Sequence, residues 1–393
     1  MTDRNSTAAT LQAAKEFTRR KILKSALVTG TALSVGPFVL PRRVLGAGQV
    51  NVFAWGDYVQ QNIIDAFESA TGIKINLSTF GSNDEAENKL RAAGGKGFDV
   101  IFPSVTNRPN YDEGDLLMPI DESRVNVDNV IPSMYRASIE LGAVKRGKRY
   151  LIPFDWGTEA ITFHSSVHPL ADDEVSFGTM WQDDPKFKGA AAFRQKSVIM
   201  GVGLYLDSIG EVNSNRMLDV YKTEEDARRV WDACTKFVLE RCQNIGAFWN
   251  NATEATAAFT DAGCSIGQTW DTTGILLGRD VDPKYKYRMP IEGGITWMDS
   301  MGIPSGVENL DEAYEFINFL LTPEIGAMFA NNTGYNSCVK GAEEYLSEAN
   351  KRIFKEVYTP EAIENLWWWQ ADTPFFAPVR QEYVEVITNH TCA

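Results

Sequence analysis

The stretch "VNVFAWGDYVQQNIIDAFESATGIKI", residues Val50–Ile75, predicts a buried strand that leads directly into an amphipathic helix. Val50–Ala54 is a short apolar run that is typical of a strand. In the segment Val59–Ala70, apolar residues that include Ile63 and Phe67 recur on one face of a helix. The stretch therefore predicts the first half of a strand–helix–strand unit.

The connection between this strand and this helix carries Trp55, Asp57 and Tyr58, where small turn-forming residues are usual. A ring beside a carboxylate suits an ammonium group. The π-face attracts a cation by roughly 0.5–2 kcal/mol, and the carboxylate adds a charge-assisted hydrogen bond. The turn therefore indicates a binding role.

The strand and helix pattern continues through Ile73–Thr79, Glu85–Ala93 and Phe98–Phe102, and the last of these strands ends at Pro103-Ser104. This alternation predicts an α/β fold with a mainly parallel sheet and helices on both faces. Because ligands bind beyond the carboxyl ends of such strands, Ser104 joins the candidate residues.

The remainder of the chain predicts a second lobe. Residues 150–163 form a strand that crosses into it, a second series of strands and helices runs from about 181 to 290, and residues 293–304 form a further strand. A helix is expected over Leu310–Leu321. A chain of 393 residues exceeds one ordinary core, and 44% hydrophobic with 23% charged residues is typical of a globular protein.

Residues 1–48 have the composition of a secretory signal peptide. A basic segment around Arg19-Arg20 precedes the apolar stretch Ala26–Leu40, and small residues follow. The arginine pair indicates a twin-arginine signal for export to the periplasm. The alternative is a basic N-terminal arm on a cytoplasmic protein.

The net charge of the chain is −14, and residues 1–48 contribute +6 of it, so the mature chain carries about −20. Such a surface repels nucleic acid and anionic membranes and mildly favours cationic ligands. We expect no nucleic-acid partner and a monomer.

The five cysteines are odd in number and show no C-x-x-C spacing for a redox or zinc site. Cys234 and Cys242 are predicted to lie about 12 Å apart along one continuous helix, beyond disulfide reach. We expect one or two bridges plus a free thiol, with the pairing open among all five: Cys234, Cys242, Cys264, Cys338 and Cys392.

Motifs for catalysis are missing from the sequence. It contains no G-x-S-x-G, no H-E-x-x-H and no P-loop, and Gly201–Gly203 lacks the third glycine of a dinucleotide site. His164 and His168 have i, i+4 spacing, but Pro169 follows them and no acidic partner is evident. We therefore expect no enzyme, no metal and no cofactor.

Rings next to acids or amides recur at other apparent strand ends. These pairs are Asp155-Trp156, Trp270-Asp271, Trp297 with Asp299, Gly334-Tyr335, and Trp367-Trp368-Trp369-Gln370. Together they point to a site for a small organic cation rather than to packing alone.

The segments "FAWGDYVQQNIIDAFESATGIKI", "FDVIFPS", "IPFDWGTEAI", "IEGGITWMDSMGIP", "AYEFINFLLTPEIGAMFANNTGY" and "WWWQAD" occur in this order. The set resembles the spermidine/putrescine-binding receptors of ABC importers, from Val50 to about Asp372. The resemblance implies a two-lobed periplasmic binding protein of type II, with mixed sheets and a ligand cleft between lobes, that serves a membrane permease. The first lobe is expected over 50–155 plus 297–334, and the second over 156–296 plus 335–393.

The resemblance also implies contacts with the ligand. The candidate residues are Trp55, Asp57, Tyr58, Ser104, Trp270, Asp271, Trp297, Asp299, Tyr335 and Gln370.

One departure concerns Arg194 and Lys196, which stand where polyamine receptors carry two carboxylates. If both cations face the cleft, they repel a polyamine and favour a zwitterionic amine, such as an amino acid or a betaine. If the local alignment is shifted, both cations are solvated. Glu159 or Asp271 would supply the missing negative charge. A ferric-binding receptor and a sensor without transport are further alternatives.

Overall fold

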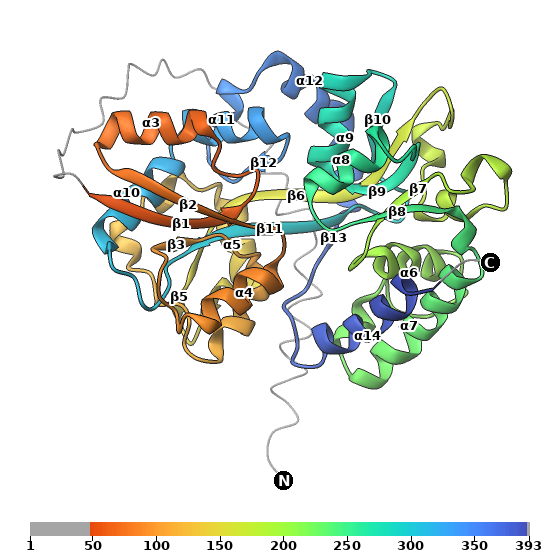
Figure 1. Cartoon of the computed structure of the whole chain (residues 1–393), viewed down its shortest axis with the longest axis horizontal. Helices are drawn as coiled ribbons and strands as arrows, with labels where there is room; N and C mark the ends of the chain where they lie inside the picture. The colour runs from red at the N-terminus through yellow and green to blue at the C-terminus, as the bar shows by residue number, and fades with distance from the viewer. Residues whose placement is uncertain (1–47, 391–393) are drawn as a thin grey trace, which may run out of the picture.

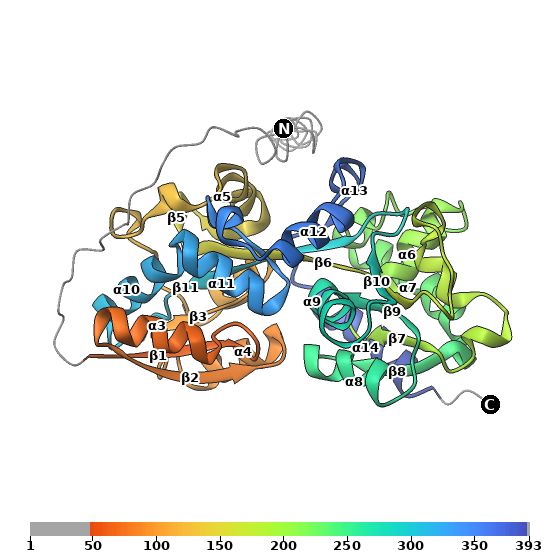
Figure 2. The same ribbon diagram turned by 90° about the horizontal axis from the view of Figure 1, so that it is seen from above.

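The computed structural model describes residues 48–390, so the predicted signal peptide and Cys392 lie outside the described residues. Within 48–390, no helix has the length and apolar character needed to cross a membrane. The chain forms two lobes that lie side by side and are joined by two long strands (Figures 1 and 2).

The first lobe begins as the sequence predicts, with alternating strands and helices. Strand β1 pairs in parallel with β2 on one side and with β3 on the other. The elements are β1 (Gln49–Trp55), α3 (Gln61–Thr71), β2 (Lys74–Phe80), α4 (Asn83–Ala92), β3 (Val100–Ile101), α5 (Pro132–Ser138), the hairpin β4 (Val144–Lys145) and β5 (Lys148–Arg149), α10 (Leu310–Leu320) and α11 (Pro323–Thr333).

The second lobe is built around three further parallel strands, in the order β9-β7-β8. Its elements are β7 (Ala191–Arg194), α6 (Val198–Ser208), α7 (Glu224–Leu239), β8 (Ile245–Trp249), α8 (Ala252–Thr260), β9 (Ile266–Trp270), α9 (Asp271–Leu276), β10 (Tyr285–Arg288) and α14 (Phe376–Thr388).

Strands β6 (Leu151–His164) and β11 (Ile295–Gly302) run through both lobes as an antiparallel pair (Figure 1). They lie at the centre of the order β2-β1-β3-β11-β6-β9-β7-β8. The sheet is therefore mixed, and the mainly parallel sheet predicted from the strand–helix alternation holds only for its two outer thirds. The α/β fold with two lobes and mixed sheets is confirmed.

Two separate apolar cores lie in the described chain. The first contains Phe53 and Phe102 of the first lobe, and the second contains Phe193 and Trp231 of the second lobe, all fully buried. The exact division of the chain between the lobes stays a prediction. The short helix η11 (Ala342–Tyr345), which the sequence assigned to the second lobe, packs against α11 of the first.

The final segment returns to both lobes. Strands β12 (Asn336–Ser337) and β13 (Trp367–Trp368) pair with β6 and β11, and α12 (Glu348–Val357) and α13 (Pro360–Glu364) lie between them in the chain. The segment after β13 leads into α14 of the second lobe.

Helix α7 ends at Leu239, so the continuous helix predicted from Cys234 to Cys242 is wrong. Cys242 begins a short 3-10 turn instead and is disulfide-bonded. Cys234, Cys264 and Cys338 are free and buried.

Candidate functional site

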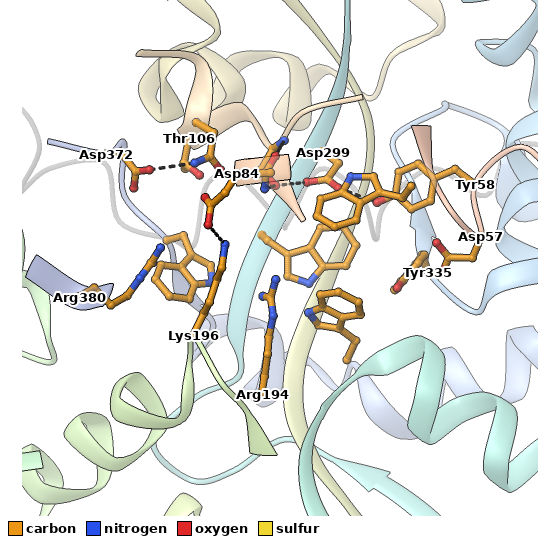
Figure 3. A pocket seen from close by; sticks show the side chains of 17 residues that line it. Asp57, Tyr58, Asp84, Thr106, Arg194, Lys196, Asp299, Tyr335, Asp372 and Arg380 are labelled. Carbon is orange, nitrogen blue, oxygen red and sulfur yellow. Dashed lines mark hydrogen bonds and ion pairs between the residues drawn. The ribbon is translucent and has the colours of Figure 1, made fainter. Parts of the chain in front are cut away.

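A pocket lies between the lobes and receives side chains from both (Figure 3). It lies at the carboxyl ends of β1, β3, β7 and β9 and along β11, which is where the strand pattern predicted ligand contacts. Its lining consists of Trp55, Asp57, Tyr58, Asn83, Asp84, Ser104, Thr106, Asn107, Arg194, Lys196, Trp270, Trp297, Asp299, Tyr335, Trp369, Asp372 and Arg380.

The turn between β1 and α3 supplies the first acid of the pocket. The backbone N–H of Tyr58 donates to the carbonyl of Trp55 over 3.2 Å, which closes a tight turn around Asp57. Burial raises the pKa of Asp57 to about 6, against the lowering effect of its own backbone amide and of the Tyr335 hydroxyl. One oxygen of Asp57, Oδ2, is buried without a hydrogen bond from any described residue.

Asp299 on β11 supplies the second acid and is held by two hydroxyls. Ser104 Oγ donates to Oδ1 over 2.5 Å, and the Tyr58 hydroxyl donates to Oδ2 over 2.7 Å. Asn83 at the start of α4 bonds both the backbone N–H and the hydroxyl of Ser104, so Asn83, Ser104, Asp299 and Tyr58 form one connected group of four residues. Burial raises the pKa of Asp299 to about 6, while both hydroxyls act to lower it.

Aromatic rings form the walls around these acids. Trp297 and Tyr335 meet edge to face with centroids 5.0 Å apart, and Trp55 meets Trp270 edge to face at 6.1 Å. Gly334 ends α11 with a φ of 79°, a left-handed conformation that suits glycine, and so turns the next residue into the pocket. The indole N–H groups of Trp55 and Trp297 are buried without hydrogen-bond partners among the described residues.

A third acid, Asp155 of β6, lies beside Asp299 on the neighbouring strand. The two residues are paired in the β6–β11 register, and Asp155 is fully buried. Among residues 48–390, neither carboxyl oxygen of Asp155 has a hydrogen-bond partner. Burial, followed by repulsion from Asp299, raises the pKa of Asp155 well above its usual range.

Basic side chains face the pocket from the second lobe. Arg194 ends β7, Lys196 follows it, and Arg380 lies on α14 (Figure 3). Lys196 forms an ion pair with Asp84 of α4, which belongs to the first lobe. Burial lowers the pKa of Lys196 to about 8, while Asp84 acts to raise it.

Eight of the ten candidate residues line this one pocket; the structure places Asp271 and Gln370 outside its lining. The carboxylate of Asp271 accepts bonds from the Thr158 backbone N–H at 3.1 Å and the Tyr358 hydroxyl at 2.6 Å. The side chain of Gln370 donates to the Trp368 carbonyl over 2.7 Å. Both side chains are therefore engaged with the protein itself.

Sequence reasoning did not single out the polar pocket residues on α4 and on the 3-10 helix η1 (Val105–Asp112). It also did not single out the polar pocket residues near the C-terminus. Asp84 follows the strand β2 and was open to the same strand-end rule that found Asp57. Arg380 lies inside an ordinary helix, and no local pattern marks it. The residues missed are Asn83, Asp84, Thr106, Asn107, Asp372 and Arg380. Trp369 belongs to the tryptophan run that precedes Gln370, although it was not itself a candidate.

Two lobes joined by crossing strands, with a charged aromatic pocket between them, define a receptor for a small solute. A sequence profile of the bacterial extracellular solute-binding proteins matches residues 62–354, and the chain belongs to this family. The resemblance found in the sequence is thereby confirmed, and the family is one of transport proteins rather than of enzymes.

Curated relatives and a solved structure agree. The spermidine/putrescine-binding periplasmic protein of Escherichia coli K12 is 25% identical over 85% of this chain and 89% of its own. The putrescine-binding periplasmic protein PotF of the same organism is 26% identical over 86% of this chain and 90% of its own. A putative spermidine/putrescine ABC transporter structure from Listeria monocytogenes shares the fold with a TM-score of 0.73 and 23% identity, over 87% of this chain and 99% of that one.

Proposed function

We propose that this protein is a periplasmic receptor that captures a polyamine or a similar small organic amine and delivers it to the permease of an ABC importer. The observation that carries the proposal is the placement of two carboxylates, the half-buried Asp57 and the buried Asp299, among the aromatic rings of the pocket between the lobes.

The electrostatics of this pocket favour a cation. A carboxylate that is removed from water is costly unless a positive partner compensates it. An ammonium group placed beside Asp57 and Asp299 provides that partner, and the surrounding indole and phenol rings attract the same charge through their faces. The methylene groups of an alkyl amine then contact the rings.

The transport role is supported by the family and by the relatives, which are spermidine- and putrescine-binding periplasmic proteins. Because side chains of both lobes line the pocket, a ligand stabilises the arrangement in which the lobes are close together. A permease that recognises this arrangement accepts only the loaded receptor. Export through the twin-arginine signal and action as a monomer complete the proposal.

The test is calorimetric titration of the mature protein, unfolded and refolded to remove carried-over ligand, with putrescine and spermidine. We expect heat of binding from at least one short amine. If no compound in a panel of monoamines, diamines, polyamines and ω-amino acids binds, the proposed function is wrong.

Asp299→Asn should weaken amine binding by about 1.5–3 kcal/mol, the usual range for a lost charge-assisted hydrogen bond. The matched control is Asp311→Asn, which makes the same change at an exposed carboxylate on α10. Equal affinities for the Asp299→Asn variant and the parent protein would remove Asp299 from the amine site.

A further inference from the structure

Arg194 is largely buried, with 13% of its side chain exposed, and its guanidinium has donors that the protein does not use. The guanidinium stacks over Trp270, with 4.5 Å between its central carbon and the ring centroid, and points into the pocket (Figure 3). No described residue accepts a hydrogen bond from Arg194 within 3.5 Å, and its Nε is buried without a partner. A buried guanidinium in this state favours an incoming acceptor.

The one acid beside Arg194 does not occupy these donors. Glu159 Oε2 lies 3.6 Å from Nη1 of Arg194, which is longer than a hydrogen bond. The other carboxylate oxygen of Glu159 is held by Ser197 Oγ and Gln268 Nε2. Glu159 therefore offsets part of the positive charge of Arg194, while Ser197 and Gln268 hold the Glu159 side chain in position.

Arg380, on α14, brings a second guanidinium to the pocket (Figure 3). It packs over Phe376 and Trp369, at 5.0 and 5.7 Å from their ring centroids. Within residues 48–390, no carboxylate lies within 4.0 Å of the Arg380 guanidinium. Lys196, in contrast, is already paired with Asp84. Arg194 and Arg380 are therefore the two cations of the pocket that have no direct hydrogen-bonded carboxylate.

We propose that Arg194, assisted by Arg380, forms a second subsite for a carboxylate, and that the natural ligand is a zwitterion whose ammonium group pairs with Asp57 and Asp299. The proposal rests on the proposed function, because it places the ammonium in the same acidic and aromatic end. The guanidinium fork presents parallel donors that match a carboxylate. A multiply charged anion is disfavoured because four aspartates also line the pocket, namely Asp57, Asp84, Asp299 and Asp372.

A diamine fits this arrangement less well. Its second ammonium would lie against Arg194 and Arg380 and would leave the guanidinium donors unused. An alkyl chain with one amine and a neutral end avoids the repulsion but gains no hydrogen bond. The expected order of affinity is therefore zwitterion first, monoamine second and diamine last.

Matched ligands test this order in the unaltered protein. Butylamine, putrescine and 4-aminobutyrate have chains of similar length and end in a methyl group, an ammonium and a carboxylate, and pentyl and hexyl series extend the comparison. We expect the ω-amino acid of the best-fitting length to bind about 10- to 150-fold more tightly than the diamine of that length. If a diamine binds tightest, the carboxylate subsite is refuted while the amine receptor stands. If none of the three classes binds, the proposed function fails as well.

Arg194→Gln should reduce binding of the ω-amino acid by about 10-fold or more and leave butylamine within about threefold. Arg229→Gln is the matched control, since Arg229 lies on α7 and pairs with Asp226 within the second lobe. Because Arg194→Gln leaves Glu159 buried without its cation, the double variant Arg194→Gln with Glu159→Gln keeps the local charge balanced. If both variants lose affinity equally for butylamine and for the ω-amino acid, Arg194 stabilises the pocket and does not bind the carboxylate.

Discussion

Individual carboxylates decide how this pocket recognises charge. Burial raises the pKa of Asp57 and of Asp299 to about 6, and it raises the pKa of Asp155, beside Asp299, well above its usual range. At neutral pH the first two are ionised at a cost in free energy that a bound ammonium group removes. The acids thus favour the cation without any change in the fold.

The titration of Asp57 should appear in the stability of the ligand-free protein. Its pKa is raised from 3.8 to about 6, so the folded chain binds a proton more tightly than the unfolded chain. The stabilising contribution is fully present below about pH 4 and is lost as the pH rises through about 6. As the pH rises between these values, the melting temperature of the parent protein should therefore fall relative to that of Asp57→Asn.

Thermal melts of both proteins across this range, without ligand, measure the difference. Asp311→Asn provides the control for a substituted but exposed carboxylate. A constant difference in melting temperature between parent and Asp57→Asn over the whole range would contradict the assignment.

At the scale of single helices and strands, the sequence patterns located most elements but misplaced some of their ends. Helix α4 begins at Asn83 rather than at the predicted Glu85, because Ser82 caps it by accepting from the Glu85 backbone N–H. Strand β3 is limited to Val100–Ile101, which pair with Val52 and Phe53, although the flanking Asp99 and Phe102 of the predicted Phe98–Phe102 also donate backbone hydrogen bonds to β1. Apolar periodicity reports burial, whereas caps and pairing set the ends.

Strand β6 carries a close contact that positions a ring of the site. In the β6–β11 pairing Gly157 lies opposite Trp297, and a Cβ at Gly157 would come within 2.3 Å of the indole and 2.8 Å of an Asp271 oxygen. Gly157→Ala should therefore displace the Trp297 ring, lower the free energy of unfolding by about 1–3 kcal/mol and weaken ligand binding.

Chemical denaturation and titration of the same preparation check both effects. Gly56→Ala is the matched control for stability, because a Cβ there meets no atom within 4 Å. Parent-like stability and affinity in Gly157→Ala would show that the ring adapts without cost.

Across the molecule, a few polar contacts join the lobes around the pocket. Lys196 after β7 pairs with Asp84 of α4, and Asp372 in the segment before α14 accepts from Asn107 Nδ2 over 2.9 Å. A contact that spans two lobes is broken when they separate, so the Lys196–Asp84 pair should favour the arrangement of the lobes described here.

Lys196→Gln should weaken ligand binding about two- to fivefold. A partly exposed ion pair contributes about 0.2–1 kcal/mol, and Asp84 is 49% exposed. Small-angle scattering of the ligand-free variant should also show a larger radius of gyration than the parent if the pair draws the lobes together. Lys222→Gln is the control, because Lys222 pairs with Asp219 inside one lobe. Unchanged affinity and radius for Lys196→Gln would assign no role to this pair in closure.

Local patterns in the chain were sufficient for the alternating strands and helices and for the ring and acid pairs at strand ends, because periodicity and turn composition are properties of neighbouring residues. They placed Asp57, Ser104 and Asp299 at strand ends or on a strand, and their order carried the family resemblance. The tertiary structure alone decided which of these groups meet. Asp155 lies beside Asp299, and Arg380 reaches the pocket from α14, because the pairing of β6 with β11 and the return of the C-terminal segment bring distant parts of the chain together. Whether an acid accepts a cation or serves the fold, as Asp271 does, depends on the partners that this packing supplies.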